Sequence, residues 1–194
     1  VLKKLMISHS KGQRVHGEEA LALPASKCQT VWLDMGPQQK AKYDALPKPQ
    51  LRVAREGCKV TKLELALATV AQACSVPEYV RPAKMQALLE DLHALKRTEP
   101  EMHAVVFTHH VCAYDVIKSR LSENGFSVCG FSGSTAPKDR HATIRSFQES
   151  VEARKPGISK VFVATMKVGN VGITLTAATR VYLMEPCLDP MMEV

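Results

Sequence analysis

The second half of the chain alternates short apolar runs with longer amphipathic stretches. The runs at residues 104–108, 126–131, 161–164 and 181–184 are typical of buried strands, because a strand covered on both faces carries apolar residues without alternation. After the first run, Tyr114, Ile117 and Leu121 recur at the spacing of one helical face. This order predicts a parallel sheet with helices on both faces.

Glycine, proline and small polar residues mark the ends of these elements. Gly125 suits a helix end, residues 132–135 suit a small polar turn, and Pro137 suits the first turn of a helix with Ile144 and Phe147 on its inner face. The stretch 165–174 after the third run contains Gly169 and is predicted to be a loop.

The first half of the chain gives weaker signals. A strand is predicted at residues 28–35 and a short helix at 38–46, followed by a basic linker after Pro47 and Pro49. Apolar residues at intervals of three and four predict a helix from about residue 60, and a second helix at 83–96.

Composition narrows the class of protein. A chain of 194 residues that is 45% hydrophobic can bury one full core and a smaller appendage. No apolar stretch reaches membrane-spanning length, so we expect an intracellular protein without a membrane partner. The six cysteines lie far apart and are expected to be reduced, mostly buried thiols. The net charge of +7 fits a nucleic-acid partner and a merely solvated surface about equally well.

Polar and small residues follow each predicted strand, at the edge of the sheet where open parallel sheets bind ligands. Hydroxyls, glycine amides and helix N-termini are suitable phosphate ligands because they offer oriented donors. The residues are Thr108, His109 and His110 after the first run; Ser132, Gly133 and Ser134 after the second; Thr165, Met166, Lys167, Gly169 and Asn170 after the third; and Glu185 after the fourth.

Three segments occur in a recognisable order: VVFTHH, GFSGSTAPKDRHATIRSF and VFVATMKVGNVGITLTAATRVYLMEP. Together they resemble motifs four, four-a and five in the second lobe of Swi/Snf-type DNA-dependent ATPases, within the superfamily-two helicases. Upstream, ALALPASKCQTVWLDMGPQQKAKYDAL resembles the family's exit from lobe one, and PAKMQALLEDLHAL resembles the helix before motif four. The resemblance implies a RecA-like fold of the P-loop NTPase type at residues 61–194, preceded by a mostly helical or irregular segment. Residues 1–60 would be the end of lobe one and the inter-lobe linker.

The resemblance also implies roles for individual residues. DNA phosphates would be bound by Thr108, His109, Ser132, Gly133, Ser134, Arg140, Thr165 and Lys167. The nucleotide would be contacted by Gly169, Gly172 and Glu185. Two positions depart from the usual motif five, since Asn170 stands where a glycine is usual and Thr174 where an asparagine is usual.

Simpler interpretations exist for several of these residues. Adjacent histidines at 109 and 110 have no third ligand at suitable spacing, so we expect no metal site. Ser132, Gly133 and Ser134 also suit an ordinary tight turn, and Arg140 falls where an arginine of the family is plausibly structural.

Catalysis would need parts that this sequence does not contain. It has no Gly-x-x-x-x-Gly-Lys-Ser/Thr loop, no Asp-Glu pair after a strand and no motif-six arginines. We therefore expect a nuclear ATP- and magnesium-dependent DNA translocase as the parent protein, with duplex DNA, nucleosomes and its own first lobe as partners. This chain alone is expected not to hydrolyse ATP. The alternative is a noncatalytic nucleic-acid or protein-binding module; a small-molecule enzyme would need a catalytic constellation that the sequence lacks.

Overall fold

The computed structural model describes residues 14–15, 18–19, 27–45, 82–152, 158–169 and 173–186. The chain forms two compact units, residues 1–32 and 33–194. In the first, β1 (Arg14–Val15) pairs antiparallel with β2 (Glu18–Glu19). None of the helices in the described ranges is long and apolar enough to cross a membrane.

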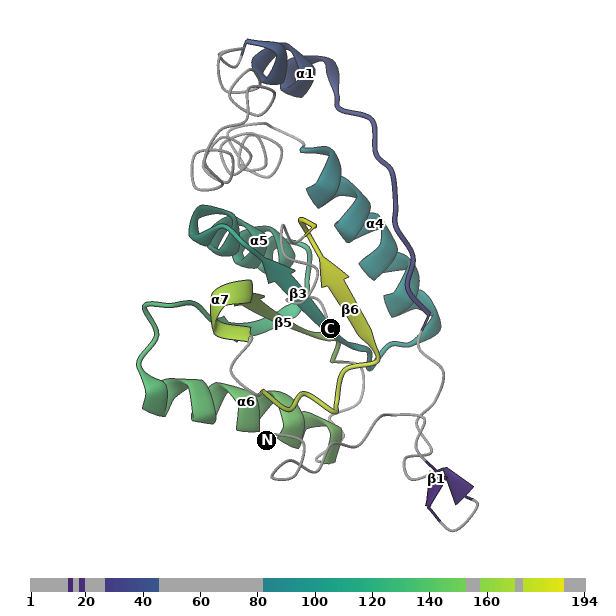
Figure 1. Ribbon diagram of the computed structural model, residues 1–194, viewed down its shortest axis with the longest axis vertical. Coiled ribbons are helices and arrows are strands. Elements are labelled where there is room, and N and C mark those ends of the chain that lie inside the picture. Colours follow the sequence, from purple (N-terminus) through teal and green to yellow (C-terminus); the bar gives the residue numbers. More distant parts are fainter. Residues whose placement is uncertain are drawn as a thin grey trace, which may run out of the picture. The chain divides into compact units, whose positions relative to one another are not determined.

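The second unit contains a parallel sheet of four strands in the order β4-β5-β3-β6 (Figure 1). The strands are β3 (His103–Thr108), β4 (Ser127–Phe131), β5 (Lys160–Thr165) and β6 (Arg180–Leu183). The predicted parallel sheet is confirmed, and each predicted strand agrees with an observed one to within a residue or so at its ends.

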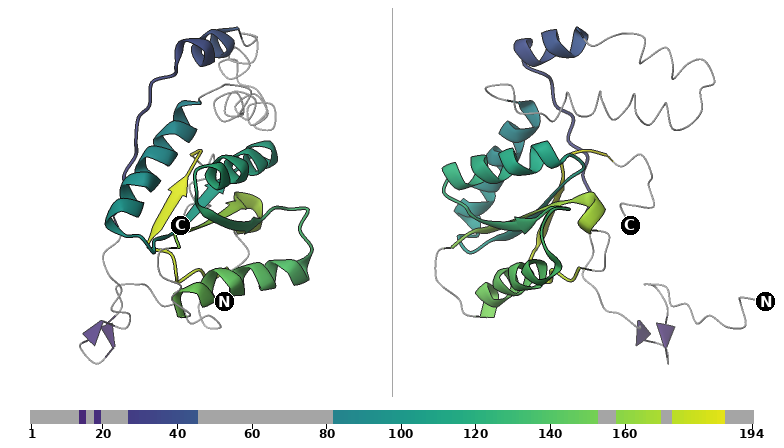
Figure 2. Two further views of the ribbon diagram at one scale, coloured as in Figure 1. Left: turned by 180° about the vertical axis from the view of Figure 1, so that it is seen from behind. Right: turned by 90° about the vertical axis from the view of Figure 1, so that its left-hand side faces the viewer.

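Helices cover both faces of this sheet, as predicted. The views of Figure 2 show α4 (Ala83–Thr98) and α5 (Val111–Glu123) on one side and α6 (Pro137–Glu152) on the other. Tyr114, Ile117 and Leu121 are all buried on α5, which confirms the helical stripe. Gly125 after that helix has φ of 77°, a backbone angle that glycine tolerates best.

Alternate residues of each central strand enter two different cores. Ala104 and Val106 of β3 pack with Leu92 of α4 and Leu121 of α5. On the opposite face, Val105 belongs to a smaller core that also contains residues of α6, β4 and β5. The residues that complete this second core are Phe131, Phe147, Phe162, Ala164 and Val168. Both faces are therefore apolar, which explains the unbroken apolar runs in the sequence.

Gly130 brings β4 close to β5. Its φ is 148°, and a Cβ atom at this position would lie 1.9 Å from the carbonyl oxygen of Val163. No side chain fits in that space, so the glycine permits the strand pairing next to the turn at residues 132–135.

The predictions for the N-terminal half agree less well with the structure. The predicted helix at 38–46 is observed as α1 (Pro37–Asp44), but residues 28–35 form no strand. A strand needs a partner, and none of the described strands pairs with this segment, which leaves Val31 and Trp32 63% and 92% exposed. The predicted helix from residue 60, and the lobe boundary between residues 60 and 61, lie outside the described residues.

Two further expectations need correction. The first part of the predicted loop at 165–174 is a helical turn, α7 (Met166–Gly169), because Met166 and Val168 bury their side chains. Cys28 and Cys112 are exposed rather than buried, whereas Cys129 is partly buried. Burial raises the pKa of the Cys129 thiol to about 11, which makes this cysteine unreactive near neutral pH.

Candidate nucleic-acid interface at the carboxyl edge of the sheet

The strand register brings most of the predicted site residues to one edge of the sheet. Thr108 pairs with Thr165 at the carboxyl ends of β3 and β5. Phe131, the last residue of β4, pairs with Ala164, so Ser132 follows next to the same edge. Phe107 pairs with Leu183, which places Glu185 just beyond the end of β6. Four separated segments of sequence therefore meet here.

The side chain of Thr108 points into the protein rather than to solvent. It is fully buried, and its hydroxyl donates a hydrogen bond to Glu185 Oε1 at 3.2 Å. The same hydroxyl oxygen accepts from the backbone N–H of His110 at 3.3 Å. Glu185 is 4% exposed, and its Oε2 accepts from the backbone N–H of His109 at 2.9 Å. The carboxylate thus ties the end of β6 to the loop between β3 and α5.

His110 is the N-cap residue of α5, directly before Val111. Its Nε2 atom is buried and has no hydrogen-bond partner among the described residues. Burial lowers the pKa of His110, and His109 and Lys84 lower it further. The nearby carboxylate of Glu185 raises this pKa and so opposes the other effects. The imidazole is therefore held preferentially in its neutral form.

The turn after β4 presents hydroxyl groups at the same edge. Ser132 Oγ and Ser134 Oγ lie 2.9 Å apart, and the backbone N–H of Ser132 donates to Thr135 Oγ1 at 3.2 Å. Gly133 and Ser134 are exposed, whereas Ser132 is buried. The turn therefore offers the Ser134 hydroxyl and the Gly133 backbone to a ligand.

Arg140, near the start of α6, stabilises the turn at residues 132–135. Its Nε donates to the carbonyl of Thr135 at 2.9 Å, and a terminal nitrogen donates to the carbonyl of Gly133 at 3.3 Å. The guanidinium carbon also lies 5.8 Å from the centroid of the Phe131 ring. Much of the donor capacity of Arg140 is thus used within the protein.

The last residue of β5 and the residues that follow it differ in their exposure. Thr165 is 3% exposed, so its side chain supports the edge from inside. Lys167 is exposed on α7, and Gly169 ends that helix. Gly172 lies outside the described residues. Of the predicted phosphate ligands, His109 and Arg140 are partly exposed, and Gly133, Ser134 and Lys167 are exposed.

Two residues of this region were missed by the sequence analysis. Gly130 carried no signal beyond being a glycine in a strand, which is a recognisable sign of close backbone approach. Gln148 on α6 binds the segment before β6 through its side-chain amide. Nothing in its spacing could have revealed this, because its partners lie 26 to 29 residues further along the chain.

Known proteins with similar sequences share this region. Residues 83–194 match the helicase conserved C-terminal domain family. The chain is 33% identical over 116 residues to the human helicase-like transcription factor, covering 60% of this chain and 11% of that protein. It is 31% identical over 103 residues to the ATP-dependent helicase rhp16 of Schizosaccharomyces pombe, covering 53% of this chain and 11% of that protein. The matches thus span about a tenth of the length of these relatives.

Solved structures share the fold. The Sulfolobus solfataricus SWI2/SNF2 ATPase core domain superposes with a TM-score of 0.66 at 22% identity, over 84% of this chain and 35% of that one. The C-terminal domain of the same ATPase gives a TM-score of 0.62 at 22% identity, over 80% of this chain and 70% of that one.

The parallel sheet, its two helical layers and the polar carboxyl edge define a RecA-like lobe. The family match covers more than half of the chain, so the chain belongs to the helicase conserved C-terminal domain family.

Proposed function

We propose that this chain is the second lobe of an ATP-dependent DNA translocase and that its carboxyl edge binds phosphates of duplex DNA. The observation that carries the proposal is the convergence at this edge of three separate segments, in which His109 is partly exposed and Ser134 and Lys167 are exposed. A phosphate diester is bound by oriented N–H and O–H donors and by positive charge. This edge supplies the hydroxyl of Ser134 as a donor and the positive charge of Lys167.

The buried residues of the edge would act by holding these donors in place. Glu185 fixes the backbone of His109 at the start of α5, and Arg140 fixes the carbonyls of the turn that carries Ser134. The burial of Glu185 favours this supporting role over direct contact with a nucleotide. Thr108 donates to the Glu185 carboxylate, and its hydroxyl also accepts from the backbone N–H of His110. Thr108 therefore stabilises the same loop.

We assign nucleotide contact to Gly169 and Gly172, of which Gly172 lies outside the described residues. ATP would supply the free energy for closing and reopening the two lobes, and the phosphate contacts of this lobe would shift along the DNA. Within the described residues, no group of three His, Cys, Asp or Glu could hold a metal ion.

The relatives indicate the setting in which such a lobe would work. They include DNA repair protein RAD5 of Candida albicans, 34% identical over 113 residues. The solved structures of similar fold include a Sulfolobus solfataricus SWI2/SNF2 ATPase core in complex with double-stranded DNA, with a TM-score of 0.63 at 21% identity. We therefore propose a nuclear DNA-repair or chromatin-remodelling protein, with duplex DNA, nucleosomes and its own first lobe as partners.

The test is ATP hydrolysis by this chain and by the protein extended in both directions along its gene, each with and without duplex DNA. The proposal expects hydrolysis only in the extended protein, with a faster rate when DNA is present. An extended protein with folded lobes that binds DNA but hydrolyses no ATP would instead establish the noncatalytic binding module.

A further inference from the structure

Helix α6 carries a row of basic residues on the side that faces away from the sheet. Lys138, His141 and Arg145 are all exposed. At about 100° per residue, these three side chains lie within roughly 60° of one another around the helix axis. Phe147, on the opposite side of the helix, is fully buried in the core that α6 shares with the sheet. We call Lys138, His141 and Arg145 the α6 stripe.

The order of charges along α6 is unfavourable for the helix itself. The amino end of a helix carries a partial positive charge and the carboxyl end a partial negative charge, so bases are favoured in the last turn. All the bases of α6 lie at residues 137–145, where Lys138 is the second residue of the helix, and its last turn has none. The sequence places Glu149 and Glu152 at the carboxyl end instead. Helix stability therefore does not account for the stripe, whereas binding of a negatively charged partner does.

The other charged residues in the first half of the helix face elsewhere. Asp139 lies at least about 100° around the axis from each residue of the stripe. Arg140 is turned toward the protein, where it donates to the carbonyls of Thr135 and Gly133. The first half of α6 thus presents positive charge outward, directly after the exposed residues Gly133 and Ser134.

The length of the stripe suits the width of a duplex. An α-helix rises about 1.5 Å per residue, so Lys138 and Arg145 lie about 2 Å and about 12 Å along the axis from Pro137. The two backbones of B-form DNA are separated by a minor groove about 6 Å wide. When one strand is bound at the turn of Ser134, the facing strand across this groove can fall within the length of the stripe.

We propose that the α6 stripe binds phosphates of the second strand of the duplex, with the minor groove lying over the first turns of α6. This inference rests on the proposed function, which assigns the first strand to the carboxyl edge. Lysine and arginine suit the role because they neutralise phosphates without reading bases. The edge contacts are then made to single-stranded and duplex DNA alike, whereas the stripe contacts are made to duplex DNA alone.

The experiment measures binding of the extended protein to a labelled duplex and to one of its single strands by fluorescence anisotropy, without nucleotide. Lys138→Ala together with Arg145→Ala removes two charges of the stripe and is the stripe variant. Lys138→Arg together with Arg145→Lys keeps both charges and is the exchange variant. The matched control, Arg97→Ala together with Arg120→Ala, removes two exposed charges from the last turns of α4 and α5.

We expect the stripe variant to bind the duplex about tenfold more weakly and to reduce the slope of log affinity against log salt concentration by about two, as for two lost phosphate contacts. Its affinity for the single strand should change less than about twofold, because no second strand is present. The exchange variant and the control should match the unchanged protein on both DNAs. Lys138→Ala alone should not lower the melting temperature, because it removes a cation from the amino end of a helix.

Three results would overturn the inference. An unchanged duplex affinity in the stripe variant would leave the stripe to solvent or to an acidic protein partner. An equal loss on duplex and single strand would place the stripe on the same strand as the edge. An equal loss in the control would reduce the effect to overall charge. The proposed function fails separately, if Ser134→Ala together with Lys167→Ala leaves the binding of both DNAs unchanged.

Discussion

The carboxylate of Glu185 accepts a hydrogen bond from the backbone N–H of His109 at 2.9 Å, and these residues lie 76 positions apart in the sequence. The contact fastens the end of β6 to the loop that starts α5. A loop between a strand and a helix has few restraints of its own, so a buried carboxylate that binds both its backbone and Thr108 can set its geometry.

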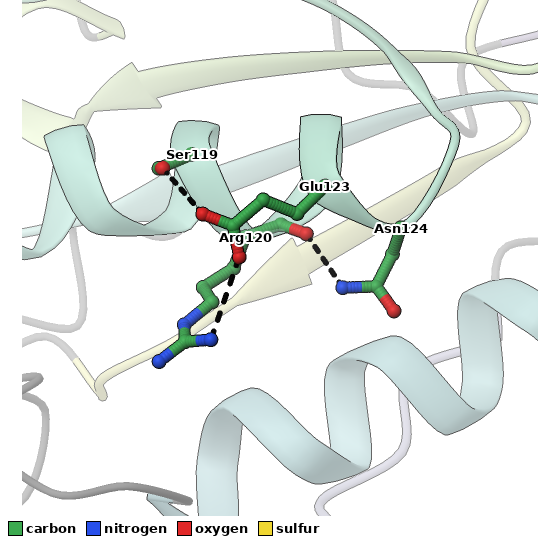
Figure 3. A network of polar contacts seen from close by, with 4 residues as sticks. All are labelled: Ser119, Arg120, Glu123 and Asn124. Atoms are coloured by element: carbon green, nitrogen blue, oxygen red, sulfur yellow. Dashed lines mark hydrogen bonds and ion pairs between the residues drawn. The ribbon is translucent and has the colours of Figure 1, made fainter.

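Replacing Glu185 with glutamine tests this role. The amide oxygen can still accept from the His109 N–H, but the amide nitrogen then faces Thr108 Oγ1, and the hydroxyl proton of Thr108 loses its carboxylate acceptor. Hydrogen bonds to a charged group are worth more than neutral ones, so we expect the free energy of unfolding to fall by about 2 kcal/mol in urea titrations. The control is Glu123→Gln, which removes the carboxylate charge from the exposed contacts to Ser119 and Arg120 drawn in Figure 3. That change should cost under about 0.5 kcal/mol; equal costs at the two positions would contradict the role of Glu185.

The turn that carries Ser134 depends on the shape of Arg140 as well as its charge. Lysine keeps the charge but cannot bind two carbonyls in the fork geometry of a guanidinium. We therefore expect Arg140→Lys to weaken duplex DNA binding nearly as much as Arg140→Ala, by roughly fivefold, the loss expected from about one hydrogen bond. Fluorescence anisotropy with labelled DNA measures this. Arg120→Lys, at the far end of α5, should leave the affinity unchanged (Figure 3). Full recovery by Arg140→Lys would show that only the charge matters.

The stability of the lobe should depend on the protonation of His110. Burial lowers the pKa of this residue below its ordinary value of 6.5, despite the opposing carboxylate of Glu185. His109 and Lys84 add to the lowering. In the unfolded chain the imidazole takes up a proton more readily, so stability that is present above pH 6.5 is lost as the pH falls through the folded-state pKa.

Melting temperatures measured from about pH 8 to about pH 5 test this dependence. The variant His110→Asn keeps a residue that begins helices well and removes the titrating group. Its melting temperature should fall less with acid than that of the unchanged chain. His141→Asn changes an exposed histidine of α6 and serves as the control. Parallel curves for all three proteins would refute the assignment to His110.

Lys167 should account for about one phosphate contact. Each neutralised phosphate contributes roughly 0.9 to the slope of log affinity against log salt concentration on duplex DNA. Lys167→Ala should therefore weaken binding and reduce this slope by about one. Arg97→Ala removes the same charge from the last turn of α4, next to the amino end of β3, and should leave the slope unchanged. If Lys167→Ala and Arg97→Ala reduce the slope equally, the effect of Lys167 is one of overall charge and not of a defined phosphate contact.

The sheet and its helices could be predicted because the central strands β3 and β5 have both faces buried and the helices α4 and α5 each bury one face. The run at residues 181–184 was expected to be buried, but Val181 and Leu183 are exposed on the edge strand β6. Val105 and Val106 enter different cores, and this two-sided burial produces the continuous apolar runs that predict a parallel sheet. The location of the candidate site could be predicted because residues at the carboxyl ends of parallel strands gather at one edge of the sheet. Thr108 and Thr165 do pair at that edge.

The orientation of individual side chains could not be predicted in the same way. Thr108 is buried against Glu185, although its position after a strand is equally compatible with an exposed hydroxyl. Gln148 acts through partners that a linear pattern does not place near it. The expected strand at residues 28–35 had the right composition, but strand formation depends on a neighbour that local sequence does not specify.

The most direct test of the central claim is DNA-stimulated ATP hydrolysis by the extended protein carrying Ser134→Ala together with Lys167→Ala. If the carboxyl edge of this lobe binds the DNA, duplex DNA will stimulate the unchanged protein and the Ser119→Ala control but will stimulate the double variant at least about tenfold less, as expected for two lost phosphate contacts. Equal stimulation of the double variant and the unchanged protein would show that DNA is bound elsewhere.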